Sequence, residues 1–237
     1  MDTYGYTDMQ LISREECEQL KILLAYFGGD RLHMHFMLYW GLIWQNIYRI
    51  ENIKGISFHS IFVRTVFGVQ PLESRPFVKE AEDDESHGWE SRYDLLPGRT
   101  VILAPYANSF NEELTKDWWE ALVDELIARG FKVFTNSSGD KEPVIAGTER
   151  VFLSYEDMFK VLGVAGYLVG MRSGLFDLMN EAACTKVVIY QEFITRERMN
   201  FFSLKNMYGC RNAYEYQLAN TPEGRQALRQ RILEEVF

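Results

Sequence analysis

Apolar and polar positions follow one pattern in the first third of the chain and another in the remainder. Between residues 20 and 27 the apolar side chains recur at helical spacing, which predicts an amphipathic helix. The segment Met34–Trp44 is apolar almost all round, so we expect a helix covered by the rest of the chain or by a second copy. Residues 1–78 are therefore predicted to be mainly helical.

After residue 98 the pattern changes to short apolar runs that alternate with amphipathic segments. Continuous apolar runs of this length are typical of parallel strands covered on both faces. The predicted strands are Val101–Ala104, Phe131–Thr135, Val151–Ser154, Tyr167–Met171 and Val187–Tyr190. Helices are predicted over Thr115–Arg129, Asp157–Val164 and Ser173–Ala183, and a last one opens at Thr221 and Pro222.

This alternation predicts an α/β fold, an open parallel Rossmann-like sheet flanked by helices and preceded by a mainly helical N-terminal region. The segment between these two parts is rich in acidic residues and has no core pattern. We therefore expect three parts, namely a helical region over 1–78, an acidic linker over 79–97 and an α/β domain over 98–237 that ends in a helix.

Composition and charge narrow the function classes. The chain of 237 residues is 47% hydrophobic and 25% charged, as in soluble globular proteins, and its net charge is −9. An acidic chain does not favour nucleic-acid binding, because such proteins gather Lys and Arg against phosphates. The start has no basic stretch before an apolar one, and the longest apolar run has eleven residues where a membrane span needs ~20. Three widely spaced cysteines fit a reducing compartment. We expect a cytoplasmic protein.

Candidate chemistry follows the fourth predicted strand. In an open parallel sheet, ligands bind outside the carboxyl ends of the strands. Here Arg172, Ser173 and Gly174 lie where that strand turns into a helix. Backbone N–H groups at a helix start and an arginine fork both suit a phosphate, and glycine allows a close approach. The alternative is a plain turn, with Ser173 as N-cap and Arg172 in a surface ion pair.

Other candidates are weaker. Asn108 and Ser109 follow the first strand and are either phosphate contacts or turn residues. Asp177, one turn into the fourth-strand helix, either holds a ribose hydroxyl or complements the helix dipole. His33 and His35 stand two apart, which does not suit a helical metal pair, so we expect no metal. We also expect no cofactor. The familiar hydrolase, P-loop, dinucleotide and zincin motifs do not occur in the sequence.

Residues 98–193 resemble the second domain of two-domain (GT-B) glycosyltransferases, closest to the heptosyltransferase-like family 9. The resemblance is carried by the segment Val101–Ser109, by the tryptophan-bearing helix that ends at Gly130, by Phe131–Asn136, and by the strand–Arg-Ser-Gly-Leu–helix–strand order of Tyr167–Tyr190. It implies a nucleotide-sugar donor site. Donor and phosphate contacts would come from Asn108, Ser109, Arg172, Ser173, Gly174 and Leu175. Base or ribose contacts would come from Thr135, Asn136 and Asp177.

The resemblance implies a glycosyltransferase of bacterial surface-polysaccharide or lipopolysaccharide assembly, acting on a saccharide or glycolipid acceptor. Its association with a membrane surface or a second copy would use the 34–44 helix. The first third is short for a complete acceptor domain, and the catalytic base is unassigned among Asp30, His33 and His35. A non-catalytic nucleotide-sugar-binding module is therefore the alternative. A sugar-nucleotide epimerase is a third hypothesis, for which no cluster of acidic and basic groups is visible.

Overall fold

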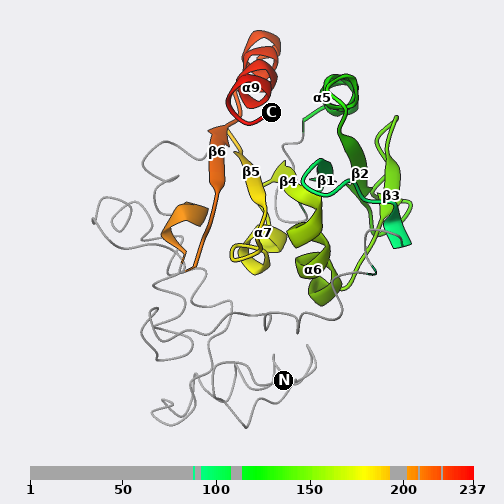
Figure 1. Cartoon of the computed structure of the whole chain (residues 1–237). Coiled ribbons are helices and arrows are strands. Elements are labelled where there is room, and N and C mark those ends of the chain that lie inside the picture. The colour runs from blue at the N-terminus through cyan, green and yellow to red at the C-terminus, as the bar shows by residue number, and fades with distance from the viewer. Residues whose placement is uncertain (1–87, 89–91, 108–113, 193–201, 208, 220) are drawn as a thin grey trace, which may run out of the picture. The chain divides into compact units, whose positions relative to one another are not determined.

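The computed structural model describes residues 88, 92–107, 114–192, 202–207, 209–219 and 221–237. All of these lie in one compact unit, Val78–Phe237 (Figure 1). The predicted helical region 1–78, with the 34–44 helix and the three candidate bases, lies outside the described residues, as do most of the acidic linker and the pair Asn108 and Ser109.

The described part is built on a six-stranded parallel sheet. Its strands are β1 (Thr100–Ala104), β2 (Lys132–Asn136), β3 (Glu149–Val151), β4 (Gly166–Met171), β5 (Thr185–Tyr190) and β6 (Ala213–Gln217). The spatial order is β3-β2-β1-β4-β5-β6, and every neighbouring pair is parallel. The predicted Rossmann-like α/β fold is confirmed.

The sixth strand is a difference from the sequence prediction, which gave five. The residues of β6 read Ala-Tyr-Glu-Tyr-Gln, and only Tyr216 among them is fully buried. β6 pairs with β5 and stands at the end of the strand order. A half-exposed edge strand lacks the continuous apolar run that located β1, β2, β4 and β5, since it does not need apolar residues on both faces. The other edge strand, β3, differs from its prediction for the same reason: it covers Glu149–Val151, with only Val151 buried, and shares just that residue with the predicted Val151–Ser154.

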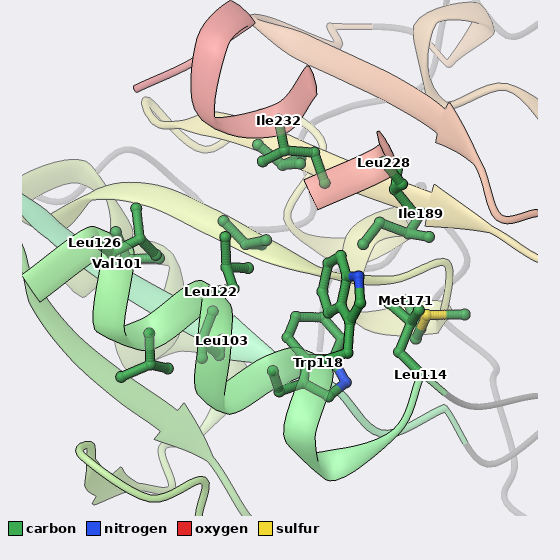
Figure 2. Packing of buried hydrophobic residues seen from close by; sticks show 14 of the residues in the cluster. Val101, Leu103, Leu114, Trp118, Leu122, Leu126, Met171, Ile189, Leu228 and Ile232 are labelled. Carbon is green, nitrogen blue, oxygen red and sulfur yellow. The ribbon is translucent and has the colours of Figure 1, made fainter. Parts of the chain in front are cut away.

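Helices cover both faces of the sheet. α5 (Lys116–Ala128) and α9 (Pro222–Glu235) pack on one face, where Trp118, Leu122 and Leu126 of α5 share one apolar cluster with Leu228 and Ile232 of α9 (Figure 2). The other face is covered by α6 (Tyr155–Ala165), α7 (Gly174–Leu178) and the short 3-10 helix η4 (Leu204–Asn206). Each face therefore has its own apolar core.

Side-chain caps explain where α6 and α9 begin. The Ser154 hydroxyl accepts a hydrogen bond from the Asp157 amide at 3.1 Å, so α6 begins at Tyr155, two residues before the predicted start. The Thr221 hydroxyl caps α9 in the same way, with Pro222 in the first turn, as predicted.

The helix predicted over Ser173–Ala183 is shorter in the structure. α7 ends at Leu178, and the chain then turns towards β5. The buried ammonium of Lys186 donates hydrogen bonds to the carbonyls of Ala182 at 2.7 Å and Cys184 at 3.2 Å. The same ammonium donates to the carbonyl of Arg211, 25 positions away, at 3.1 Å. These hydrogen bonds hold the 182–184 turn that replaces the last predicted helical turns.

Residues at the end of the predicted linker contact the α/β unit. Leu95 is 5% exposed and belongs to the core on the α6 face. The Asp94 carboxylate accepts a hydrogen bond from Lys132 Nζ at 2.8 Å. Leu95 is therefore packed against the domain, and the exposed Asp94 is paired with it.

Candidate functional site

The strand order locates the edge of the sheet where a ligand is expected. The chain runs from β1 outward to β3 and then returns to β4, which pairs with β1 on its other side. In open parallel sheets, ligands bind at the carboxyl ends of the strands where the order reverses in this way. At that point the structure places the residue run 105–107 after β1 and the run 172–174 after β4.

Two glycines near this point have opposite surroundings. A Cβ atom on Gly170, in β4, would lie 2.2 Å from the carbonyl oxygen of Ala104, its register partner in β1. Within the part of the chain that the structure describes, a Cβ atom on Gly174 would meet no heavy atom within 4 Å. Gly170 therefore allows β1 and β4 to pair closely, whereas Gly174 faces open space at the start of α7.

Ser173 and Leu175, which also belong to the predicted phosphate-binding turn, differ in the contacts of their side chains. Ser173 occupies the N-cap position of α7 with an extended backbone, but its side chain makes no hydrogen bond to the first turn. Leu175 is half-buried and packs against the core on the α6 face. The Leu175 side chain is therefore partly used in packing, while the Ser173 hydroxyl makes no capping hydrogen bond.

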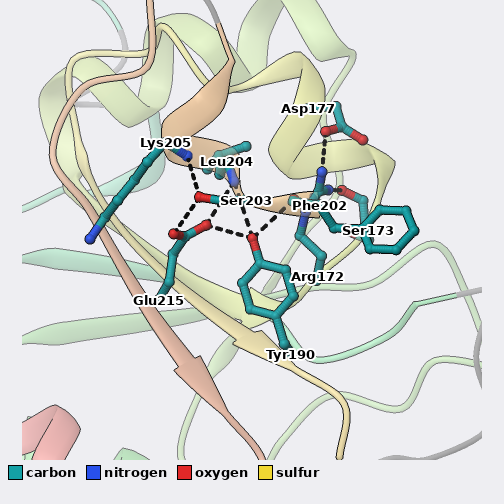
Figure 3. A network of polar contacts seen from close by, with 9 residues as sticks. All are labelled: Arg172, Ser173, Asp177, Tyr190, Phe202, Ser203, Leu204, Lys205 and Glu215. Carbon is teal, nitrogen blue, oxygen red and sulfur yellow. Dashed lines mark hydrogen bonds and ion pairs between the residues drawn. The ribbon is translucent and has the colours of Figure 1, made fainter. Parts of the chain in front are cut away.

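Arg172 is held by protein acceptors on several sides (Figure 3). Its Nη2 donates to Asp177 Oδ1 at 2.5 Å, and its Nη1 donates to the Ser173 carbonyl at 2.8 Å. Its Nε lies 3.4 Å from the Phe202 carbonyl. The arginine side chain is 13% exposed and that of Asp177 is 38% exposed. Arg172 therefore does form an ion pair, as the alternative interpretation of the sequence expected, but the arginine side of that pair is mostly buried and not on the surface.

Charge and burial act in opposite directions on this arginine. Burial lowers the pKa of Arg172, but the adjacent Asp177 carboxylate outweighs it, so the pKa lies above its ordinary value. The guanidinium therefore stays charged, and it ties the β4–α7 turn to the segment at Phe202.

A polar network that the sequence analysis did not predict adjoins Arg172. Tyr190, the last residue of β5, has its hydroxyl 2.5 Å from Glu215 Oε1 on β6. The same carboxylate accepts hydrogen bonds from the Ser203 hydroxyl and the Leu204 amide, both at 2.7 Å (Figure 3). Burial first, and then the Glu215 charge, raise the pKa of Tyr190 above its ordinary value. In the sequence, the only sign of this network is that Glu215 stands between two tyrosines, Tyr214 and Tyr216.

The two β2 residues predicted to contact the nucleobase or ribose are more buried than the sequence suggested. Thr135 is 0% exposed. Its hydroxyl lies 2.6 Å from that of Thr148 and accepts a hydrogen bond from the Ile145 amide at 3.2 Å. Thr135 therefore holds the loop after β2 by its side chain. Asn136, the last residue of β2, is half-buried at the same carboxyl edge.

Two further findings concern the described residues alone. Within them, no group of three or more His, Cys, Asp or Glu side chains is arranged to hold a metal ion. None of their helices combines the length and the apolar character required to cross a membrane.

Comparison with known proteins gives relatives by structure only. No family model matches the chain, and no curated protein matches it by sequence. A glycosyl transferase family 9 structure from Veillonella parvula aligns with a TM-score of 0.52 at 11% identity, over 76% of this chain and 54% of that one. ADP-heptose lipopolysaccharide heptosyltransferase II of E. coli gives 0.49 at 14%, over 66% and 51%. E. coli heptosyltransferase WaaC with ADP gives 0.48 at 16%, over 73% and 55%.

These alignments define what is shared. The chain spans about half the length of the solved structures that it matches. At 11% identity the likeness to the Veillonella structure concerns the fold. The resemblance predicted from the sequence is confirmed at that level, because the described parallel sheet and its flanking helices have the fold found in a family 9 glycosyltransferase.

Proposed function

We propose that this chain is a glycosyltransferase-like protein that binds a nucleotide-diphosphate sugar at the carboxyl ends of β1 and β4. One observation carries the proposal. The strand order reverses between β1 and β4, and there Gly174 faces open space, so a ligand can approach the backbone closely. The fold shared with a family 9 glycosyltransferase supports the same ligand class.

Each site residue has a role in this proposal. The diphosphate contacts the backbone of Ser173, Gly174 and Leu175, and the Ser173 hydroxyl adds a donor. Asn108 and Ser109, outside the described residues, contact it from the β1 side. Because Arg172 is held by protein acceptors, it supplies a fixed positive charge near the diphosphate and its hydrogen bonds stay within the protein.

The nucleoside end lies towards β2 in the same proposal. There Asn136 contacts the nucleobase or ribose. The Thr135 side chain does not contact the ligand and instead holds the loop after β2 through Thr148 and Ile145. The Asp177 carboxylate remains partly exposed while it is paired with Arg172, so it is able to accept a hydrogen bond from a ribose hydroxyl.

The wider role is proposed on the same basis. The protein acts in the cytoplasm in the assembly of a bacterial surface polysaccharide or lipopolysaccharide, and its acceptor is a saccharide or glycolipid. Residues 34–44 mediate contact with a membrane surface or a second copy. The described residues would stabilise the diphosphate leaving group by charge and backbone N–H groups. The alternative is a non-catalytic module that only binds the nucleotide sugar.

A matched pair of glycine variants tests the binding site. Gly174 and Gly163 both have open space where a side chain would begin, and neither has a positive φ. We expect Gly174→Leu to weaken binding of nucleoside diphosphates at least tenfold in titration calorimetry, because the new side chain fills the approach to the backbone. Gly163→Leu, on α6, should leave the affinity unchanged. Equal affinities for the two variants would exclude the assigned site.

A turnover assay separates the two functions. Wild-type protein is incubated with UDP-, GDP- and ADP-sugars, with and without saccharide acceptors, and released nucleoside diphosphate is measured. Acceptor-dependent release that is lost in Gly174→Leu identifies a transferase. Binding without release identifies the non-catalytic module, and an absence of binding contradicts both.

A further inference from the structure

One carboxylate fastens the segment 202–204 to the sheet. Glu215, half-buried in β6, accepts hydrogen bonds from the Ser203 hydroxyl and the Leu204 amide, both at 2.7 Å (Figure 3). Its Oε1 atom also accepts a hydrogen bond from the hydroxyl of Tyr190, a side chain that is 0% exposed. Hydrogen bonds to a charged acceptor are stronger than those to a neutral one. Glu215 therefore holds this segment against β5 and β6.

The same segment contacts Arg172. The Nε atom of Arg172 donates to the Phe202 carbonyl at 3.4 Å, and the Tyr190 hydroxyl lies 3.2 Å from that carbonyl. Two further hydrogen bonds of the guanidinium go to the carbonyl of Ser173, directly after Arg172, and to Asp177 on α7 (Figure 3). The Phe202 carbonyl thus links the turn between β4 and α7 to the segment that Glu215 holds.

Peptide geometry extends this link to the proposed ligand site. The Ser173 carbonyl and the Gly174 amide belong to one planar trans peptide, so their C=O and N–H bonds point in opposite directions. Arg172 Nη1 donates to that carbonyl at 2.8 Å, and it therefore restricts the direction of the Gly174 N–H. Because the guanidinium is planar, a contact at its Nε atom restricts the directions of both Nη groups.

We propose that Glu215 is a positioning residue for nucleoside diphosphate binding, acting through Tyr190 and the segment 202–204 on Arg172 and thereby on the Gly174 N–H. This inference rests on the proposed function, in which the diphosphate contacts the backbone of the turn after β4. Glu215 itself does not contact the ligand. It keeps the Phe202 carbonyl in place, so that the turn already has its binding geometry before the ligand arrives. Binding sites need such support from groups behind the contacting atoms to hold their geometry within about 0.5 Å.

The test replaces Glu215 by glutamine, which keeps the shape of the side chain and removes its charge. UDP, GDP and ADP are titrated into wild type and Glu215→Gln by calorimetry, and the melting temperatures without ligand are measured. We expect the affinity for the nucleoside diphosphate that wild type binds to fall about three- to tenfold. Tyr190→Phe should weaken binding by a similar factor. Because both changes break the same chain of contacts, the double variant should bind little more weakly than either single variant.

A second tyrosine–glutamate pair provides a matched control. The Tyr216 hydroxyl donates to Glu235 Oε2 at 2.9 Å, and this contact joins β6 to α9 on the other face of the sheet. Tyr216→Phe and Glu235→Gln remove the same chemical groups as the two test variants. They should change the melting temperature and leave the affinity for nucleoside diphosphates unchanged. A purely structural role of Glu215 would make the two pairs behave alike.

The nitrogen-15 NMR signal of the Arg172 Nε–H group reports the link without any ligand. It is assigned by its absence from the spectrum of Arg172→Lys. We expect this signal to shift in Glu215→Gln and Tyr190→Phe, because the Phe202 carbonyl moves away from its wild-type position. It should keep its position in the two control variants.

Unchanged affinity in Glu215→Gln overturns the proposal, as does equal weakening in the control pair. An Arg172 Nε–H signal that keeps its position in Glu215→Gln also overturns it. If Glu215→Gln does not fold, Tyr190→Phe decides by the same two measurements. If wild type binds no nucleoside diphosphate, the proposed function fails and this inference fails with it. That result comes from wild type alone, so it is distinguishable from a failure confined to Glu215.

Discussion

The role of Arg172 in the structure differs from the role that the sequence predicts for it. The sequence places an arginine at the expected ligand edge, where its fork suits a phosphate. In the structure the same fork contacts Asp177 and the Ser173 carbonyl, and it reaches towards the Phe202 carbonyl. The residue therefore stabilises the turn that precedes α7.

This geometry predicts a stability effect at Arg172. Arg172→Ala removes the contacts to Asp177 and Ser173, and we expect it to lower the free energy of unfolding by roughly 1–3 kcal/mol. Arg172→Lys should recover less than half of that loss, because an ammonium does not reproduce the planar fork. Urea unfolding measures both, with the exposed Lys141→Ala as control. A loss no larger than in the control would contradict the structural role.

Tyr190 gives a prediction about pH. Its pKa is raised in the folded state by burial and by the Glu215 carboxylate, so the folded state keeps the phenol proton more tightly than the unfolded state. The stability from this group is present below the unfolded pKa of about 10 and is lost as pH rises above it. Tyr190→Phe removes that dependence.

The comparison is made by chemical unfolding of wild type and Tyr190→Phe between pH 8 and 11. We expect wild type to be the more stable at pH 8, where the phenol makes its hydrogen bonds. Its advantage should shrink above pH 10 by up to about 1.4 kcal/mol per pH unit. Tyr216 and Lys186, whose pKa values are also shifted, are present in both proteins and cancel. If the difference in unfolding free energy between the two proteins stays constant over this range, the pKa of Tyr190 is not raised by folding.

At the scale of elements, the pairing of β1 with β4 determines where the ligand edge is. These two strands start the two halves of the sheet and share five register pairs, from Thr100 with Gly166 to Ala104 with Gly170. The close approach at the last pair requires a residue without a side chain. The geometry of the edge therefore depends on one glycine within a strand.

We predict that Gly170→Ala is severely destabilising, by roughly 3 kcal/mol or more, because the added methyl group would overlap the Ala104 carbonyl and the backbone has to move. Gly163→Ala is the matched control, since its site is open and lies within α6. That substitution should raise stability by about 0.5–1 kcal/mol through helix propensity. Similar stabilities of the two variants in urea would show that β1 and β4 are not so close.

At the scale of the whole molecule, helices pack on each face of the sheet separately, and the proposed ligand site lies at the carboxyl ends of the strands. The two apolar cores lie on opposite faces. The polar groups discussed above include Arg172, directly after β4, and Tyr190, the last residue of β5, which contacts Glu215 in the middle of β6. Binding at this edge should therefore stabilise the fold as a unit.

A ligand that binds only the folded state raises its stability by mass action, by about 2.7 kcal/mol at a hundredfold excess over the dissociation constant. We expect the melting temperature to rise with nucleoside diphosphate concentration along that relation, using the dissociation constant from calorimetry. Inorganic phosphate at equal concentration is the control and should give a smaller shift. Equal shifts for both would indicate a general anion effect.

The sequence by itself determined the fold class and most element positions of the described unit. Buried parallel strands must be apolar on both faces, so β1, β2, β4 and β5 each appear as a continuous apolar run that local pattern can locate. Capping residues such as Thr221 located the start of α9, because they act on backbone groups only three residues away. The edge strand β6 lacked such a run and was found only in the structure.

The tertiary structure decided what the side chains at the ligand edge do. Whether Arg172 faces a phosphate or Asp177, whether Thr135 is exposed, and which acid meets Tyr190 all depend on strand order and register. The Tyr190–Glu215 contact joins two strands across 25 positions, and the Thr135–Thr148 contact spans 13 positions. Arg172 and Asp177 are only five positions apart, but the burial of their ion pair depends on the segments packed around them. Local periodicity contains no information about such pairs, because it records only which face of its own element a residue occupies.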